Sequence, residues 1–69
     1  MDAIGKTFKH YKGNLYKIID EAIHSETHEE LIIYVDLNDE SKKWARPKDM
    51  FFENIIFEGK EIERFTLVD

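Results

Sequence analysis

The stretch AIHSETHEEL, residues 22–31, carries the densest group of side chains able to do chemistry. His24, Glu26 and His28 occupy alternate positions in it, so on an extended strand they would project from one side. Imidazole and carboxylate groups placed together are ligands for zinc or iron. One hypothesis is therefore a small metal-dependent enzyme, or an enzyme of another kind, that uses His24 and Glu26.

The same stretch also has the composition of a tight loop. The hydroxyls of Ser25 and Thr27 can bond nearby backbone N–H groups, and His24 can bond a carboxylate or a carbonyl at the edge of the core. Ser25 and His24 do not make a nucleophile and base pair on a strand, because adjacent side chains point to opposite faces. We therefore favour loop anchoring, and expect no catalytic residue, no metal ligand and no cofactor.

A third interpretation makes this loop one wall of a binding groove. Trp44 offers a large ring with an N–H group, and Arg46 offers a planar guanidinium that fits a carboxylate or a phosphate. One residue separates them, so on a strand both face the same side. The candidate binding residues are His24, Ser25, Glu26, Thr27, Trp44 and Arg46. In the alternative, Trp44 belongs to the core and Arg46 pairs internally with Glu26 or Glu30, and the sequence leaves both open.

Length and composition limit the remaining classes of protein. The 69 residues suffice for one domain, residues 1–69, with residues 1–6 as an N-terminal arm. With no cysteine the chain has neither disulfides nor thiolate ligands, and it has no apolar run long enough to span a bilayer. We see no signal peptide, and expect a soluble protein of the cytoplasm. The net charge of −5 opposes attraction to phosphate backbones, so nucleic-acid binding is only a second alternative.

Most of the chain has the pattern of short strands. Gly13 and Asn14 suit a tight turn between aromatic residues and predict a β-hairpin. The run Leu31–Val35 predicts a strand, and WARP, residues 44–47, predicts a short one. Pro47–Phe51 suits one helical turn with proline first, and the break at Gly59 predicts a final hairpin.

The stretch LYKIIDEAIH, residues 15–24, is ambiguous. Its apolar residues fall at helical spacing, which favours an amphipathic helix: Leu15, Ile18, Ile19, Ala22 and Ile23. A strand with a bulge near Asp20 and Glu21 is the competing interpretation. Taken alone, the spacing favours the helix.

The order of HYKGNLY, AIHSET and WARPKDMF along residues 10–53 resembles the bacterial family called domain of unknown function 1653. The resemblance implies an SH3-like β-barrel, and so a strand in the ambiguous stretch. Family members often carry a glycine near Asp20, which this chain lacks. Histidine is not usual at the position of His28, which weakens the metal hypothesis. No activity is assigned to the family.

The fold we expect is mainly β, a small SH3-like β-barrel with one short helical turn after Pro47. Met50 and Phe51 would cover one open end of the barrel, and Phe52 would point outward. The function we expect is a non-catalytic binding module. Its partner is unknown, with a peptide or a small anionic ligand fitting best, no membrane contact, and a homodimer as a further arrangement.

Overall fold

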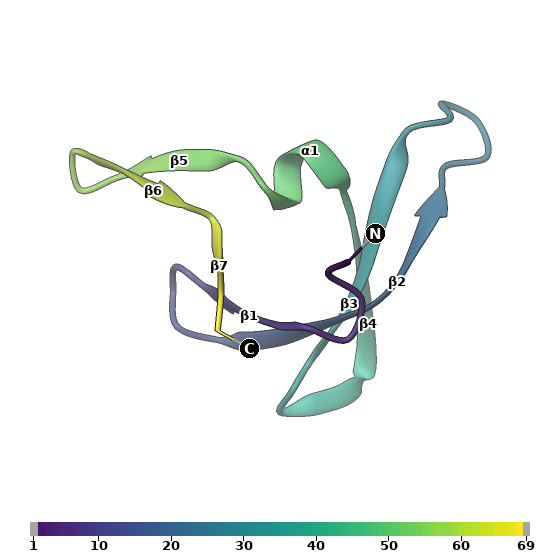
Figure 1. Ribbon diagram of the computed structural model, residues 1–69, viewed down its shortest axis with the longest axis horizontal. Helices are drawn as coiled ribbons and strands as arrows, with labels where there is room; N and C mark the ends of the chain where they lie inside the picture. Colours follow the sequence, from purple (N-terminus) through teal and green to yellow (C-terminus); the bar gives the residue numbers. More distant parts are fainter. Residues whose placement is uncertain (1, 69) are drawn as a thin grey trace.

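The computed structural model describes residues 2–68, which form seven strands and one short helix (Figure 1). The elements are β1 (Thr7–His10), β2 (Leu15–Ile23), β3 (Glu30–Asp36), β4 (Asp39–Pro47), α1 (Lys48–Phe51), β5 (Asn54–Phe57), β6 (Lys60–Glu63) and β7 (Phe65–Leu67). The prediction of a mainly β fold with one short helix after Pro47 is confirmed. Within residues 2–68 no helix is long and apolar enough to cross a membrane.

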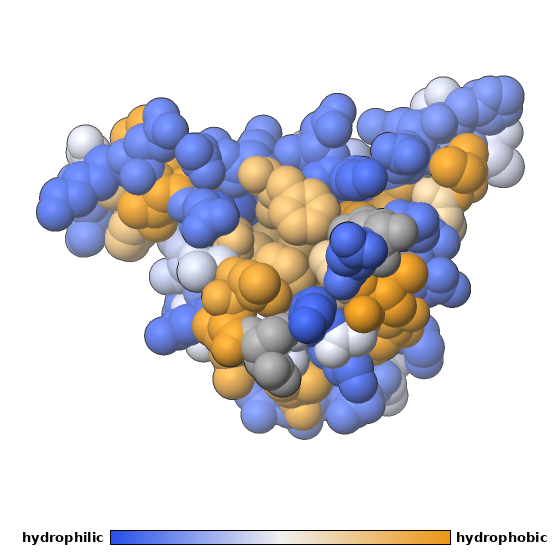
Figure 2. All heavy atoms as spheres, in the orientation of Figure 1, coloured by the Kyte–Doolittle hydropathy of each residue, from blue (hydrophilic) through white to orange (hydrophobic). Residues whose placement is uncertain are grey.

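The strands form two antiparallel sheets. Five of them pair in the order β4-β3-β2-β1-β7, and β5 and β6 make a separate two-stranded ribbon. The ribbon projects to one side of the molecule and the tip of the β2–β3 hairpin projects to the other (Figure 1). Hydrophilic residues cover most of both projecting parts, although the ribbon also shows a group of apolar residues, and further apolar residues gather in the middle of the molecule (Figure 2).

The helix that the spacing of residues 15–24 favours is wrong, because this stretch is strand β2. The residues of the supposed apolar stripe do not share an environment: Ile18 is fully buried, whereas Ile23 is 60% exposed. β2 pairs with β3 from Tyr16 to Ile23, and this pairing overrides local periodicity. The register shifts between Ile18 and Asp20, so the irregularity predicted near Asp20 is present. Such a bulge bends and twists a strand.

Tight turns hold the outer hairpins. The β1–β2 turn contains Gly13 at φ 110°, as the sequence predicts. In the β5–β6 turn both central residues have positive φ, Glu58 at 53° and Gly59 at 79°. Two-residue turns of this handedness match the twist of antiparallel strands. At the base of the ribbon, Arg64 Nη2 pairs with Glu53 Oε1 at 2.6 Å.

The core is a small, mainly aromatic cluster whose residues come from the beginning, the middle and the end of the chain. It comprises Phe8, Ile18, Ile32, Tyr34, Phe51 and Phe65. Phe51 of α1 is fully buried and stacks on Phe65 at 4.0 Å between ring centroids, with 3° between the planes. Edge contacts at 5.4 and 5.3 Å join Phe51 to Phe8 and Tyr34. α1 thus covers the core through one side chain.

Only one of the two residues expected to cover the core does so. Phe51 is buried as predicted, but Met50 is 43% exposed, so its predicted role is wrong. α1 has only four residues, and adjacent positions on a single turn point in different directions. Phe52 is 44% exposed, yet its ring also makes an edge-to-face contact with Phe8, with 6.0 Å between the ring centroids.

The residues expected to form an N-terminal arm lie against the sheet. Gly5 donates its N–H to the carbonyl of Ile18 at 2.8 Å, and Ala3 packs against the core. Met1 lies outside the described residues.

The packing predicts unequal effects of truncating the two neighbours in α1. Phe51→Ala should lower the free energy of unfolding by about 3 to 5 kcal/mol, because it leaves a cavity among aromatic rings. Met50→Ala is the matched control and should cost less than about 1 kcal/mol. Urea unfolding followed by Trp44 fluorescence measures both. Equal losses would show that Phe51 is not the main contact between α1 and the sheet.

Candidate functional site

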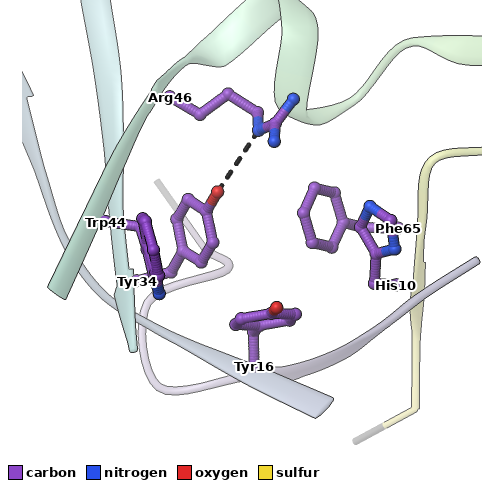
Figure 3. Close-up of a pocket in the computed structure, with 6 residues that line it drawn as sticks. All are labelled: His10, Tyr16, Tyr34, Trp44, Arg46 and Phe65. Carbon is purple, nitrogen blue, oxygen red and sulfur yellow. Dashed lines mark hydrogen bonds between the residues drawn. The ribbon is translucent and has the colours of Figure 1, made fainter. Parts of the chain in front are cut away.

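A hollow of about 220 Å³ lies on the inner face of the curved five-stranded sheet. It is lined by His10, Tyr16, Tyr34, Trp44, Arg46 and Phe65 (Figure 3). Each of the five strands contributes to it: β1, β2, β3 and β7 supply one residue each and β4 supplies two. The curvature of the sheet therefore brings together residues that lie as far apart as 10 and 65 in the sequence.

Aromatic rings make the inner surface of the hollow. Tyr16 and Tyr34 meet edge to face at 5.4 Å, and each also meets Phe65 in this way, at 5.9 and 5.7 Å. Tyr34 and Phe65 are buried and belong to the core. Edge-to-face packing is the arrangement that aromatic quadrupoles prefer. The surface is therefore held in place by the same contacts that stabilise the fold.

Arg46 provides the positive charge of the hollow. Its Nε donates a hydrogen bond to the hydroxyl oxygen of Tyr34 at 3.2 Å, and its guanidinium carbon lies 5.7 Å from the centre of the Phe65 ring (Figure 3). Within residues 2–68, no carboxylate lies within ion-pair distance of Arg46. The internal pair of Arg46 with Glu26 or Glu30 is therefore wrong, and Glu30 instead lies 3.7 Å from the Lys48 amine.

Trp44 stands at the rim of the hollow and not in the core. Its side chain remains 48% exposed, so the alternative that made it a core residue is wrong. Trp44 and Arg46 both line the hollow, which confirms that they face the same side of their strand.

His10 lines the hollow too, and the sequence analysis did not select it. Its Nδ1 accepts a hydrogen bond from the backbone N–H of Lys12 at 3.1 Å. Burial lowers the pKa of His10, and the charges of Arg46, Lys12 and Arg64 lower it further. The neutral form of the ring is therefore favoured, and because Nδ1 accepts the bond from Lys12, that form carries its proton on Nε2. The sequence places His10 in the predicted first hairpin, just before the Gly13 turn. That position was the signal that could have pointed to it as a site residue.

The polar groups around the hollow are mainly hydrogen-bond donors. Arg46 and Trp44 have donors only, and the proton left on neutral His10 is also a donor. The oxygen of Tyr34 already accepts one bond from Arg46. None of the six lining residues is acidic. A hollow rich in donors and poor in acceptors suits an anion and disfavours a cation.

Residues 24–27, here called the HSET turn, form the turn at the tip of the β2–β3 hairpin. His24 Nδ1 accepts hydrogen bonds from the backbone N–H groups of Glu26 and Thr27, at 3.1 and 3.3 Å. Thr27 Oγ1 accepts one from the N–H of Glu29 at 3.3 Å. This is the loop-anchoring arrangement that we favoured, with backbone N–H groups rather than a carboxylate or carbonyl as the partners of His24.

The supposed metal face of this loop is not formed. His28 has φ 63°, in the left-handed region, so residues 24, 26 and 28 do not lie along a strand. The Nδ1 lone pair of His24 is already used by two backbone groups. In the part of the chain that the structure describes, no three His, Asp or Glu side chains are placed to hold a metal ion.

The two expected walls of the groove lie apart. Trp44 pairs with Tyr34 in β3. Tyr34 lies four residues beyond Glu30, where β3 begins at the base of the loop. At 3.3 Å per residue this separates Trp44 from the base of the loop by about 13 Å. The reason is that β4 ends opposite Leu31, so the hairpin tip projects beyond it (Figure 1). That His24, Ser25, Glu26 and Thr27 bind a ligand stays a prediction.

The turn geometry predicts a local role for His24. His24→Ala should remove the acceptor shared by two N–H groups and speed hydrogen exchange at the amides of Glu26 and Thr27. We expect a loss of about 1 kcal/mol in unfolding free energy. Ser25→Ala is the control, and should leave both amides unchanged. Unchanged exchange in His24→Ala would contradict the anchoring role.

The surroundings of His10 predict its titration. In an NMR titration its pKa should lie below 6.5, and Arg46→Ala should raise it partway, because the charge of Arg46 is the second cause after burial. Between 6.5 and the lower pKa of the folded chain, the unfolded chain binds more protons at this residue than the folded one, so stability falls as the pH falls through this interval. His10→Asn should remove that part of the pH dependence. A pKa at or above 6.5 would contradict this description.

Comparison with known proteins agrees with the sequence motifs. No curated protein and no solved structure matches the chain. The family described as "Protein of unknown function (DUF1653)" matches residues 6–67, which include all six residues that line the hollow. The chain belongs to this family.

Proposed function

We propose that this domain is a non-catalytic binding module whose hollow takes an anionic group, a carboxylate or a phosphate, carried on a flat apolar body. Arg46 would bind the anion and Trp44 would cover the apolar part. The observation that carries the proposal is the half-buried Arg46, which has no acidic partner within residues 2–68 and lies beside an exposed tryptophan.

The hydrogen-bond donors of Arg46 support this function. Its Nε is occupied by Tyr34, which fixes the plane of the guanidinium (Figure 3). Among residues 2–68 the two terminal nitrogens bond no other group, and such a planar fork can bind a carboxylate or phosphate with two parallel bonds. Fixing the fork in advance reduces the entropy lost on binding.

The size of the hollow limits the ligand. A volume of about 220 Å³ is below the range usual for sites that enclose a drug-sized molecule or cofactor. It suits one side chain or one small group, with the remainder of the ligand outside. A peptide with an acidic side chain and a small aromatic acid both meet this requirement.

Strand order and curvature support the SH3-like barrel that the family resemblance implies. Five antiparallel strands pair in the order β4-β3-β2-β1-β7, and the short helix α1 and the β5–β6 ribbon lie between β4 and the last strand β7. Loops and exposed aromatic residues serve as binding surfaces in barrels of this kind. A bacterial origin stays a prediction from the same resemblance, and a place in the cytoplasm stays a prediction from the sequence.

The test uses phenyl phosphate and benzoate as probes, with benzylamine as a cation of similar shape. On titration, NMR shifts should concentrate at the indole N–H of Trp44 and at Arg46 for the two anions, and benzylamine should bind at least about tenfold more weakly. Arg46→Ala should weaken anion binding by about tenfold or more, and Arg46→Lys should restore it only in part because the amine lacks the planar fork.

Two controls make the result decisive. The melting temperature of each variant shows that it is folded, and Arg46→Ala should cost about 1 kcal/mol because it breaks a single bond to Tyr34. Lys17→Ala removes a charge on the same sheet outside the hollow. Equal binding of benzylamine would refute the proposal. Shifts confined to residues 24–27 would move the site to the HSET turn.

A further inference from the structure

The outer edge of β4 is the longest unpaired edge in the described part of the molecule. β4 spans nine residues and stands first in the sheet order, so it pairs with β3 on one side alone. Its pairing is regular from Lys43 to Pro47 and irregular before Lys43. The opposite edge strand, β7, has three residues. Residues 39–45 are all exposed. An edge of this length presents a row of backbone donors and acceptors that another strand can use.

The second half of this edge is basic in a chain of net charge −5. Lys42, Lys43 and Arg46 lie on it, whereas the acidic residues of the strand, Asp39 and Glu40, stand at its start. Asp39 is held by Ser41, whose hydroxyl donates to its carboxylate at 2.5 Å. A partner strand next to residues 42–46 therefore meets positive charge, which favours acidic side chains and opposes basic ones.

The edge and the hollow are continuous, because β4 supplies Trp44 and Arg46 to the hollow. Side chains of an added strand would alternate between the two faces of the sheet, so every second one would lie on the face of Trp44 and Arg46. An extended peptide can therefore bond the backbone of β4 and place an acidic side chain beside Arg46 at the same time.

We propose that β4 accepts an extended acidic peptide as a further strand, with one carboxylate side chain of that peptide bound to Arg46 in the hollow. This rests on the proposed function, since it names the partner of the same site. Backbone bonds to β4 supply affinity that is independent of sequence, and the hollow and the lysines select for acidic residues.

The test uses a synthetic peptide of about six residues, the usual length of a strand, with the sequence Glu-Glu-Thr-Thr-Glu-Glu, which places glutamate on both faces of the added strand. Amides of β4 that point away from β3 should exchange rapidly in the free protein and slowly in the complex, at every second residue. Phenyl phosphate should shift the residues of the hollow without this alternating protection. A peptide with lysine in place of glutamate should not bind.

Two N-methylated forms of the peptide separate backbone pairing from side-chain binding. Methylation of one alternate set of amides removes the N–H groups that face β4 and should weaken binding by about tenfold or more, whereas methylation of the other set should leave affinity unchanged. Lys43→Glu should weaken binding of the peptide by about fivefold and leave binding of phenyl phosphate unchanged. Lys60→Glu on the β5–β6 ribbon is the matched charge reversal and should change neither.

The outcomes distinguish the two proposals. If phenyl phosphate binds the hollow but the peptide gives no alternating protection, or if both methylated forms bind equally, strand addition is refuted and the proposed function stands. If neither probe nor peptide binds, both fail. Protection of β4 that rises with protein concentration without peptide would show that a second copy pairs at this edge, and would also refute the proposal.

Discussion

The stacking of Phe51 on Phe65 is the contact on which the rest of the structure depends. It joins α1 to β7, and both rings also touch Tyr34. A chain of this length buries a small fraction of its surface compared with larger domains, so its stability comes from a few large side chains. The same Phe65 and Tyr34 form the inner surface of the hollow. Fold and candidate site are therefore built from one aromatic cluster.

Short-range signals in the sequence predicted the turns and strands well. The Gly13 and Gly59 turns and the run Leu31–Val35 appear where local chemistry places them. The stretch Leu15–Ile23 could not be assigned from its own periodicity, because its pairing with β3 decides its conformation. The burial of Phe51 followed from the need to cover the core, but the side of α1 on which Met50 lies depends on helix phase.

The candidate site was predicted in part. Trp44 and Arg46 were found from their types and their spacing along one strand, since alternation holds for any strand. The other four lining residues were not selected, because the pairing and curvature of the sheet bring them together and leave no mark in local sequence: His10, Tyr16, Tyr34 and Phe65. The HSET turn was placed beside them wrongly for a related reason. Its distance from Trp44 is set by how far the β2–β3 hairpin extends beyond the end of β4.

Because the hollow takes at least one side chain from every strand of the five-stranded sheet, a fragment that lacks any of these strands cannot form it completely. Loss of any edge strand opens it, and the aromatic rings that shape it then lose their neighbours. Binding of a ligand in the hollow therefore stabilises the whole domain against global unfolding, and not one hairpin against local fraying. A bound ligand shows that all five strands are assembled.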